Sequence, residues 1–150
     1  MRYLVENPGP SYLRLGKAGE PKFHEVVPAV SPGKWLPVQT ENRDPARVML
    51  STGAALGAAL QRANVSGHSV FSMPLWSMKT KSMQLAQAEP LHELVTLEDH
   101  LLDGGFGSWM AESVIGTPVA AKLRPIALSE QVCDMVASQA TLNRLGGLAA

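Results

Sequence analysis

The sequence predicts an α/β domain with three α/β/α layers, in which helices cover both faces of a mostly parallel sheet with room for one antiparallel edge strand. Three observations lead to this prediction. Short apolar stretches rich in branched residues recur at residues 47–51, 69–73 and 94–98. Segments with the apolar spacing of helices lie between and after them. Strands that alternate with helices form crossover units, which build parallel sheets.

The first 45 residues differ from the remainder. Prolines recur there too often for helices, at Pro8, Pro10, Pro21, Pro28, Pro32, Pro37 and Pro45. We therefore expect an extended arm at residues 1–45, outside the sheet of a domain at residues 46–150. Residues 11–15 alternate in the manner of a strand, and an isolated strand leaves its backbone groups unsatisfied. Unless the later domain supplies an edge, we expect this strand to pair with a sheet elsewhere.

The later domain divides into short elements. Leu56 and Leu60 lie one helical turn apart, Pro74 ends a strand, and Ser129 and Ser138 are suited to cap helices. Gly146 is suited to end the last helix. In chain order we expect strand 47–51, helix 54–63, strand 69–73, helix 82–88, strand 94–98, helix 108–115, strand 118–123, and helices 129–137 and 139–145.

The stretch from residue 94 to residue 112 organises this domain. Its strand ends in three titratable side chains, and a glycine-rich turn then leads into a helix. Crevices beyond the carboxyl ends of parallel strands bind ligands in α/β folds. A ligand or interface edge is therefore expected here, and its candidate residues are Glu98, Asp99, His100, Gly104, Gly105 and Gly107.

The glycine-rich turn does not match a nucleotide-binding motif. Met110 stands where a dinucleotide fingerprint needs its third glycine, and the Gly-Lys-Ser/Thr ending of a P-loop is absent. A tight turn that packs the helix on the strand is the favoured interpretation. The alternative that stays open is an anion site at the N-terminus of the helix.

The composition and the residue spacing argue against several other classes of function. Thirteen Lys and Arg balance thirteen Asp and Glu, which argues against a general binder of nucleic acid or membrane surfaces. The histidine spacing and the single cysteine, Cys133, give no zinc motif, so no metal site is expected. Ser108 follows a glycine but has no recognisable catalytic partner. The lone cysteine and the lack of a long apolar run favour a reducing, cytoplasmic location.

Two motifs resemble a known family. V-T-L-E-D-H at residues 95–100, followed by G-G-F-G-S at residues 104–108, resembles the C-terminal domain of the transketolase family. That family includes deoxyxylulose-phosphate synthases and the beta subunits of 2-oxoacid dehydrogenases. Residues 48–53 and 138–148 are similar to the opening strand and the closing helix of the same domain. Residues 9–17 are similar to the last strand of the family's pyrimidine-binding domain.

The resemblance implies what the segments do. Residues 1–45 would be the tail of a pyrimidine-binding domain plus a linker, and residues 46–150 the C-terminal domain. Lys17 occupies the position of a basic residue, more often arginine, that contacts the substrate's phosphate or acidic group, and Arg14 is a second candidate. The alternative for both is a solvated charge on a strand that faces a partner. Glu98, Asp99 and His100 would form an interface or a turn.

The implied function is that of a supporting piece. The chain would be the non-catalytic, structural and dimerising part of an enzyme that uses thiamine diphosphate to transfer a two-carbon ketol unit between sugar phosphates or related compounds. Thiamine diphosphate and a divalent metal such as Mg²⁺ would bind to other domains, on the same longer chain or a separate subunit, in a homodimer. The chain alone would contain no catalytic residue and be inactive.

The sequence is also compatible with two other functions. The chain could instead be a free-standing regulatory or anion-binding module, or a subunit of a split enzyme similar to deoxyxylulose-phosphate synthases or 2-oxoacid dehydrogenases. The sequence leaves open the donor, the acceptor, the subfamily, and whether Met1 is a natural start. It also leaves open whether the edge around His100 binds a ligand.

Overall fold

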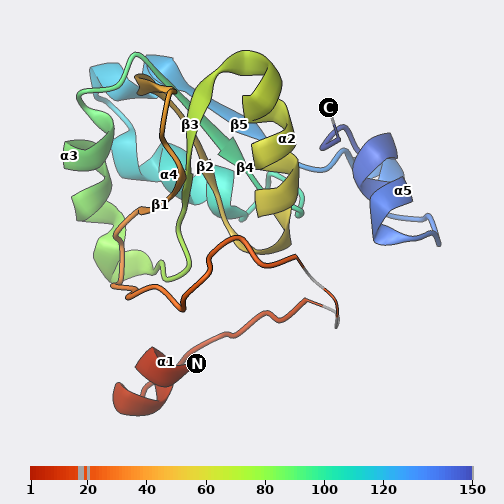
Figure 1. Ribbon diagram of the computed structural model, residues 1–150, viewed down its shortest axis with the longest axis horizontal. Helices are drawn as coiled ribbons and strands as arrows, with labels where there is room; N and C mark the ends of the chain where they lie inside the picture. Colours follow the sequence, from red (N-terminus) through yellow and green to blue (C-terminus); the bar gives the residue numbers. More distant parts are fainter. Residues whose placement is uncertain (17–18, 20, 150) are drawn as a thin grey trace.

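The computed structural model describes residues 1–16, 19 and 21–149 and contains one five-stranded sheet (Figure 1). The strand order is β1-β3-β2-β4-β5, in which β2 pairs in parallel with β3 and β4, and β4 with β5. β1 pairs antiparallel with β3 at one edge. The prediction of a mostly parallel sheet with one antiparallel edge strand is confirmed. The strands are β1 (Leu36–Gln39), β2 (Asp44–Ser51), β3 (His68–Ser72), β4 (Glu93–Leu97) and β5 (Leu123–Ile126).

Helices cover both faces of this sheet. One face packs against α2, and the other against α3 and α4 (Figure 1). Further helices are α1 near the N-terminus and α5 near the C-terminus, and four short 3-10 turns connect the elements. The helices and turns are α1 (Arg2–Glu6), η1 (Gly53–Ala55), α2 (Leu56–Ser66), η2 (Met78–Met83), α3 (Gln84–Ala88), α4 (Phe106–Val114), η3 (Pro118–Lys122), η4 (Glu130–Val132) and α5 (Gln139–Leu145).

Alternate residues of the central strand β2 supply two separate cores. Val48 and Leu50 pack with Trp109 and Met110 of α4 on one face. Met49 points to the other face, where it joins the buried residues of α2. Successive strand side chains point to opposite faces, so a central strand must be apolar at every position to serve both layers. The continuous apolar run at residues 48–50 meets this requirement.

Two predicted elements are wrong. The segment expected as a strand at residues 118–123 is the 3-10 helix η3, and β5 begins only at Leu123. Pro118 stands in the first turn of η3, where its fixed φ favours a helical start. In place of the helix expected at residues 129–137, the structure has only the short 3-10 helix η4, which Ser129 caps as predicted. Ser138 caps α5, which spans the predicted residues and ends at Gly146.

The expectation that the arm stays outside the sheet is wrong for its last part. β1 lies at residues 36–39 and pairs with β3 of the same domain. The Nε1 of Trp35 donates to Oε1 of the fully buried Gln84 at 2.8 Å, and its ring meets Phe71 edge-on at 6.2 Å. The sequence did not predict β1 because Pro37 lies within it, and proline is tolerated in a sheet only at an edge strand.

The first part of the arm lies apart from the sheet. Tyr12 and Leu15 are 87% and 71% exposed, and residues 11–15 belong to no strand. Phe23 packs against the core beneath α2 and anchors the middle of the arm. Whether residues 11–15 join the sheet of another domain stays a prediction. None of the described helices is both long and apolar enough to cross a membrane.

Replacing Gln84 by leucine should loosen the arm. Gln84 is fully buried, and its amide also donates to the carbonyls of Gly33 and Thr80 at 3.1 and 2.8 Å. An apolar side chain would leave buried polar groups unpaired, so we expect the free energy of unfolding to fall by about 2 kcal/mol. Urea titration measures this change. The exposed Gln131→Leu is the matched control, and an equal effect in both variants would contradict the assignment.

Candidate functional site

The carboxylate of Glu98 joins the end of β4 to the start of α4. Its two oxygens accept hydrogen bonds from the backbone N–H groups of Phe106 and Gly107, at 2.5 and 2.7 Å. The side chain is buried, with the residue 1% exposed. The first N–H groups of a helix lack partners within the helix and carry partial positive charge. Glu98 therefore occupies the place that an anion would take at this helix N-terminus.

Two glycines make room for this carboxylate. A Cβ at Gly105 would overlap Oε2 of Glu98 and lie 2.6 Å from the carbonyl oxygen of Leu101. A Cβ at Gly107 would lie 2.9 Å from Pro125 and 3.0 Å from Oε1 of Glu98. Gly104 differs, because its φ of +68° favours glycine while no atom crowds it. The glycine-rich turn is therefore shaped around Glu98.

Burial and hydrogen bonding act in opposite directions on Glu98. Burial raises the pKa of Glu98, whereas the hydrogen bonds from Gly107 and Phe106 lower it. Burial outweighs the hydrogen bonds, so the pKa lies above its ordinary value.

Asp99 points to the opposite side of the strand end and binds the arm. Its Oδ1 and Oδ2 accept from Nη1 and Nη2 of Arg14 at 2.6 and 2.9 Å, a bidentate pair. The Asp99 side chain is 3% exposed and that of Arg14 is 41% exposed. Gln139 of α5 donates to Oδ2 at 3.4 Å. A buried carboxylate thus brings together the arm, the end of β4 and the last helix.

His100 completes the contact with Arg14. Its Nε2 and Nδ1 lie 2.9 and 3.3 Å from Nη1 of Arg14. An arginine side chain can only donate, so the ring nitrogen that faces it must accept. The backbone carbonyl of His100 accepts from the N–H of Leu128 at 2.8 Å, which fixes the segment against the chain that follows β5.

The structure unites residues that the sequence offered as separate candidates. Arg14, expected on the arm, meets Asp99 and His100, expected at the strand end, while Glu98 turns away to cap α4. Lys17 lies outside the described residues. Gln139 was missed, because only the fold brings α5 beside residue 99.

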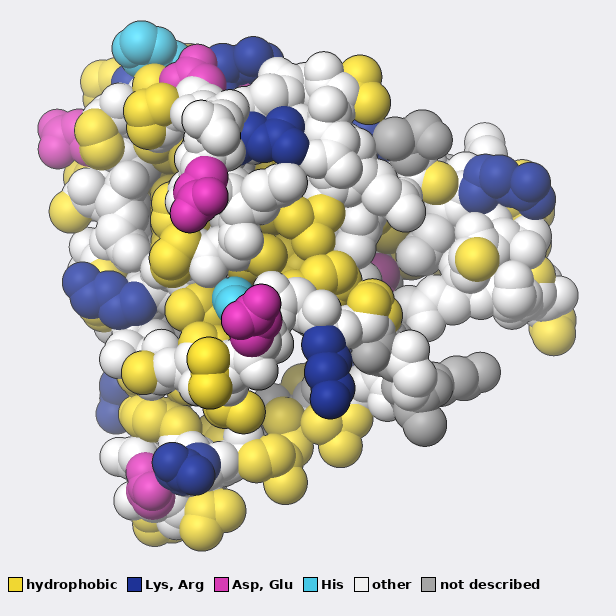
Figure 2. Space-filling view, in the orientation of Figure 1, with side chains coloured by type: hydrophobic (Ala, Val, Ile, Leu, Met, Phe, Trp, Pro, Cys, Tyr) yellow, Lys and Arg dark blue, Asp and Glu magenta, His cyan; other side chains and the backbone are white. Residues whose placement is uncertain are grey.

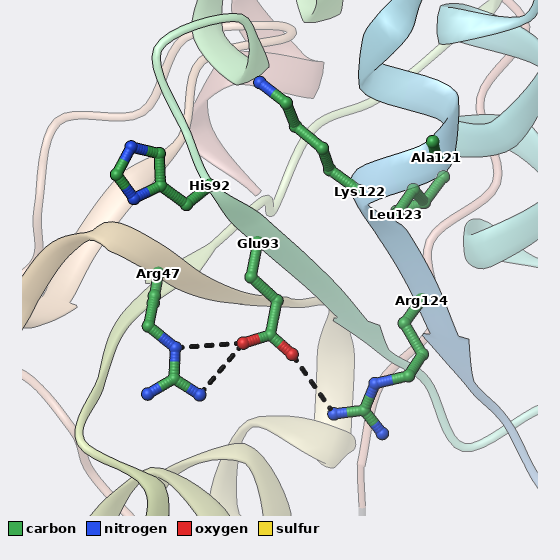
Figure 3. A pocket seen from close by; sticks show the side chains of 7 residues that line it. All are labelled: Arg47, His92, Glu93, Ala121, Lys122, Leu123 and Arg124. Carbon is green, nitrogen blue, oxygen red and sulfur yellow. Dashed lines mark hydrogen bonds and ion pairs between the residues drawn. The ribbon is translucent and has the colours of Figure 1, made fainter.

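A second charged cluster lies at the opposite, amino edge of the sheet (Figure 3). Glu93 accepts from Nε of Arg47 at 2.9 Å, and its carboxylate also lies 3.0 Å from Nε2 of His68 and 3.7 Å from Arg124. Figure 3 shows both arginines pointing to Glu93, while Lys122 extends away from it. A cavity of about 580 Å³ adjoins them, lined by Arg47, His92, Glu93, Ala121, Lys122, Leu123 and Arg124.

This second cluster braces the strands. Burial and the charge of Arg47 lower the pKa of the 1% exposed His68. Burial would raise the pKa of Glu93, but hydrogen bonds from Arg47 and the neighbouring charges bring it below its ordinary value. The cations are engaged by one shared carboxylate and by carbonyl groups, as Lys122 is by Leu91 at 2.8 Å. The sequence did not reveal the cluster, because its residues come from four separate strands.

The described residues contain no group of three or more His, Cys, Asp or Glu side chains that could hold a metal ion.

Comparison with known proteins identifies the fold. No protein-family model matches the sequence, and no curated protein matches it significantly. A solved chain described as "Split gene transketolase, inactive beta4 tetramer" superposes with a TM-score of 0.74 over 99% of this chain. The chain has a transketolase-like fold. Sequence identity to that solved structure is 21%, and the match covers 48% of it, so the chain spans about half the length of the transketolase.

Replacing Gly105 by alanine should destabilise the fold. The added methyl group would displace Glu98 from the N–H groups of α4. We expect the free energy of unfolding to fall by roughly 2–4 kcal/mol, the range for overpacking combined with a lost buried hydrogen bond. Urea unfolding measures the loss. Gly9→Ala is the control, since nothing lies within 4 Å of that position. Equal stability of both variants would contradict the assignment.

The stability of the protein should depend on pH through Glu98. Because its pKa is raised in the folded chain, the folded state binds this proton more tightly than the unfolded state does. Its contribution is therefore full below about pH 4.5 and is lost as the pH rises through the folded pKa. Relative to Glu98→Gln, the wild type should lose stability as the pH rises from there toward neutrality. Urea unfolding across this range tests the sign, and a constant difference would refute it.

Proposed function

We propose that this chain is the non-catalytic C-terminal part of a transketolase-like enzyme that uses thiamine diphosphate to transfer a two-carbon ketol unit between sugar phosphates or related compounds. The observation that carries the proposal is the transketolase-like fold, which extends over 99% of the chain. The resemblance of V-T-L-E-D-H and G-G-F-G-S to the family's C-terminal domain supports it independently.

Other domains would bind the cofactor and its metal, on the same longer chain or a separate subunit. The described residues offer no set of ligands for a divalent ion. The N–H groups of α4, which would suit a diphosphate, already bind Glu98. The residues present therefore do not fit thiamine diphosphate with Mg²⁺, and no step of the reaction is assigned to them. The occupied helix N-terminus also disfavours a free-standing anion-binding module.

The chain's own role would be to support a partner and to present Arg14. The arm carries exposed apolar side chains, among them Tyr12, Leu15 and Val27. Figure 2 shows such side chains gathered over the lower part of the molecule, where the arm runs in Figure 1. Apolar surface of this kind is typically covered by another domain or chain. We propose a homodimer in which the arm joins the neighbouring pyrimidine-binding domain.

Arg14 and Lys17 would contact the phosphate or acidic group of the substrate, as the resemblance implies. Arg14 supports this role because its side chain reaches the carboxyl edge of the sheet, where α/β folds bind ligands. The lone Cys133 supports a reducing, cytoplasmic location.

The proposal predicts activity only in an assembly. Calorimetry should detect no thiamine diphosphate binding to the isolated chain, whose residues do not fit the cofactor. The tagged chain, purified from its source cells, should retain a polypeptide that binds thiamine diphosphate. That complex, supplied with Mg²⁺, should transfer a ketol unit from a ketose phosphate to an aldose phosphate.

The controls separate assembly from chance association. Tagged residues 21–150 lack the exposed first part of the arm but keep Phe23 and β1, and they should retain less of the cofactor-binding polypeptide. Binding of thiamine diphosphate by the isolated chain, or a complex without ketol transfer, would overturn the proposal.

A further inference from the structure

Arg14 is held along one part of its guanidinium group only. The group has five N–H donors in a planar fork. Nη1 uses its donors on Oδ1 of Asp99 and on His100, and Nη2 uses one on Oδ2 of Asp99. The Nε–H and the second Nη2–H, which lie side by side on the remaining edge, have no acceptor among the described residues.

This remaining edge is accessible and fixed in direction. The Arg14 side chain is 41% exposed, whereas Asp99, which orients it, is 3% exposed. Gln139 binds Oδ2 of Asp99 from α5, so the carboxylate cannot turn freely. A guanidinium whose orientation is set in advance loses less entropy when its free edge binds a ligand.

The arginine at the amino edge provides a comparison within the same molecule. Arg47 places both Nε and Nη2 on Glu93 at 2.9 Å, and its Nη1 on the carbonyl of Ser66 at 3.2 Å. The Nε–Nη2 edge, which is open in Arg14, is therefore occupied by Glu93 in Arg47. Arg47 is suited to bracing strands, and Arg14 to binding a further group.

We propose that Asp99 and His100 are positioning residues that hold Arg14 so that its Nε–Nη2 edge binds an oxyanion of the substrate side-on. An oxyanion with two oxygens matches that pair of donors. Its identity as the substrate's phosphate or carboxylate rests on the proposed function, whereas the positioning of Arg14 does not. The domain that lacks catalytic residues would then act on the substrate through one arginine of the arm.

The first experiment uses the isolated chain with inorganic phosphate as the probe. NMR of chain labelled with ¹⁵N-arginine follows the Nε–H of Arg14 during titration, against sodium chloride at equal ionic strength. We expect a saturable shift with phosphate and none with chloride. Asp99→Asn should weaken the response about tenfold, the loss typical of one charge-assisted hydrogen bond. The Nε–H signal that is lost in Arg14→Lys identifies the resonance of Arg14.

Glu93→Gln is the matched control. It breaks another arginine–carboxylate pair, at the opposite end of β4. We expect it to leave the phosphate response of Arg14 unchanged. The proposal is overturned if Arg14 does not respond to phosphate, or if Asp99→Asn and Glu93→Gln weaken the response equally.

A second experiment uses the complex recovered with its cofactor-binding polypeptide. Asp99→Asn should raise KM for a phosphorylated ketose about tenfold, by loss of the same charge-assisted bond, with little change in kcat. The KM for the ketose without its phosphate should stay unchanged, which a merely structural defect would not produce. Equal changes for both ketoses would contradict the positioning role. A complex without ketol transfer would refute the proposed function, while the phosphate titration would still decide the positioning of Arg14.

Discussion

The carboxyl end of β4 depends on the contact between Glu98 and the first N–H groups of α4. Glu98 is buried, and burying a charge is costly unless hydrogen bonds compensate it. The contact fixes the path of the chain just where the strand ends. Asp99 and His100 then emerge on the other side, facing the arm. A structural carboxylate therefore determines where the neighbouring charged side chains point.

Glycine is required around this contact for space more than for backbone conformation. Gly105 has an ordinary negative φ of −82°, yet a Cβ there would collide with Glu98. Because the space that a side chain would fill is used by the carboxylate, the turn has no room for a bound phosphate either. A glycine-rich turn between a strand and a helix can thus be explained by an internal acid, without a nucleotide.

The sequence predicted the parts whose signal is local. The apolar runs of β2, β3 and β4, the serine caps and the turn after β4 are encoded by neighbouring residues. The pairing of β1 and the meeting of Arg14 with Asp99 join residues far apart in the chain. The second of these contacts depends on one long side chain of the arm, and periodicity carries no information about it. The 3-10 helix η3 was predicted as a strand and η4 as a longer helix. Pro118 and Ser129 can begin a 3-10 helix as well as these elements, so the residues at the start do not distinguish them.

The two ends of β4 show how similar charges serve different purposes. At the amino end, one carboxylate is shared by Arg47, Arg124 and His68, and Arg47 and His68 lower its pKa. Arg47 directs its donors at this carboxylate and at the carbonyl of Ser66, so it has little left for a ligand. At the carboxyl end, Asp99 takes one edge of Arg14 and leaves the other. Because oriented donors of Arg14 stay unused there, the carboxyl end is the one that we propose for recognition of an external anion, whereas the carboxylate of Glu93 at the amino end pairs with cations of the protein itself.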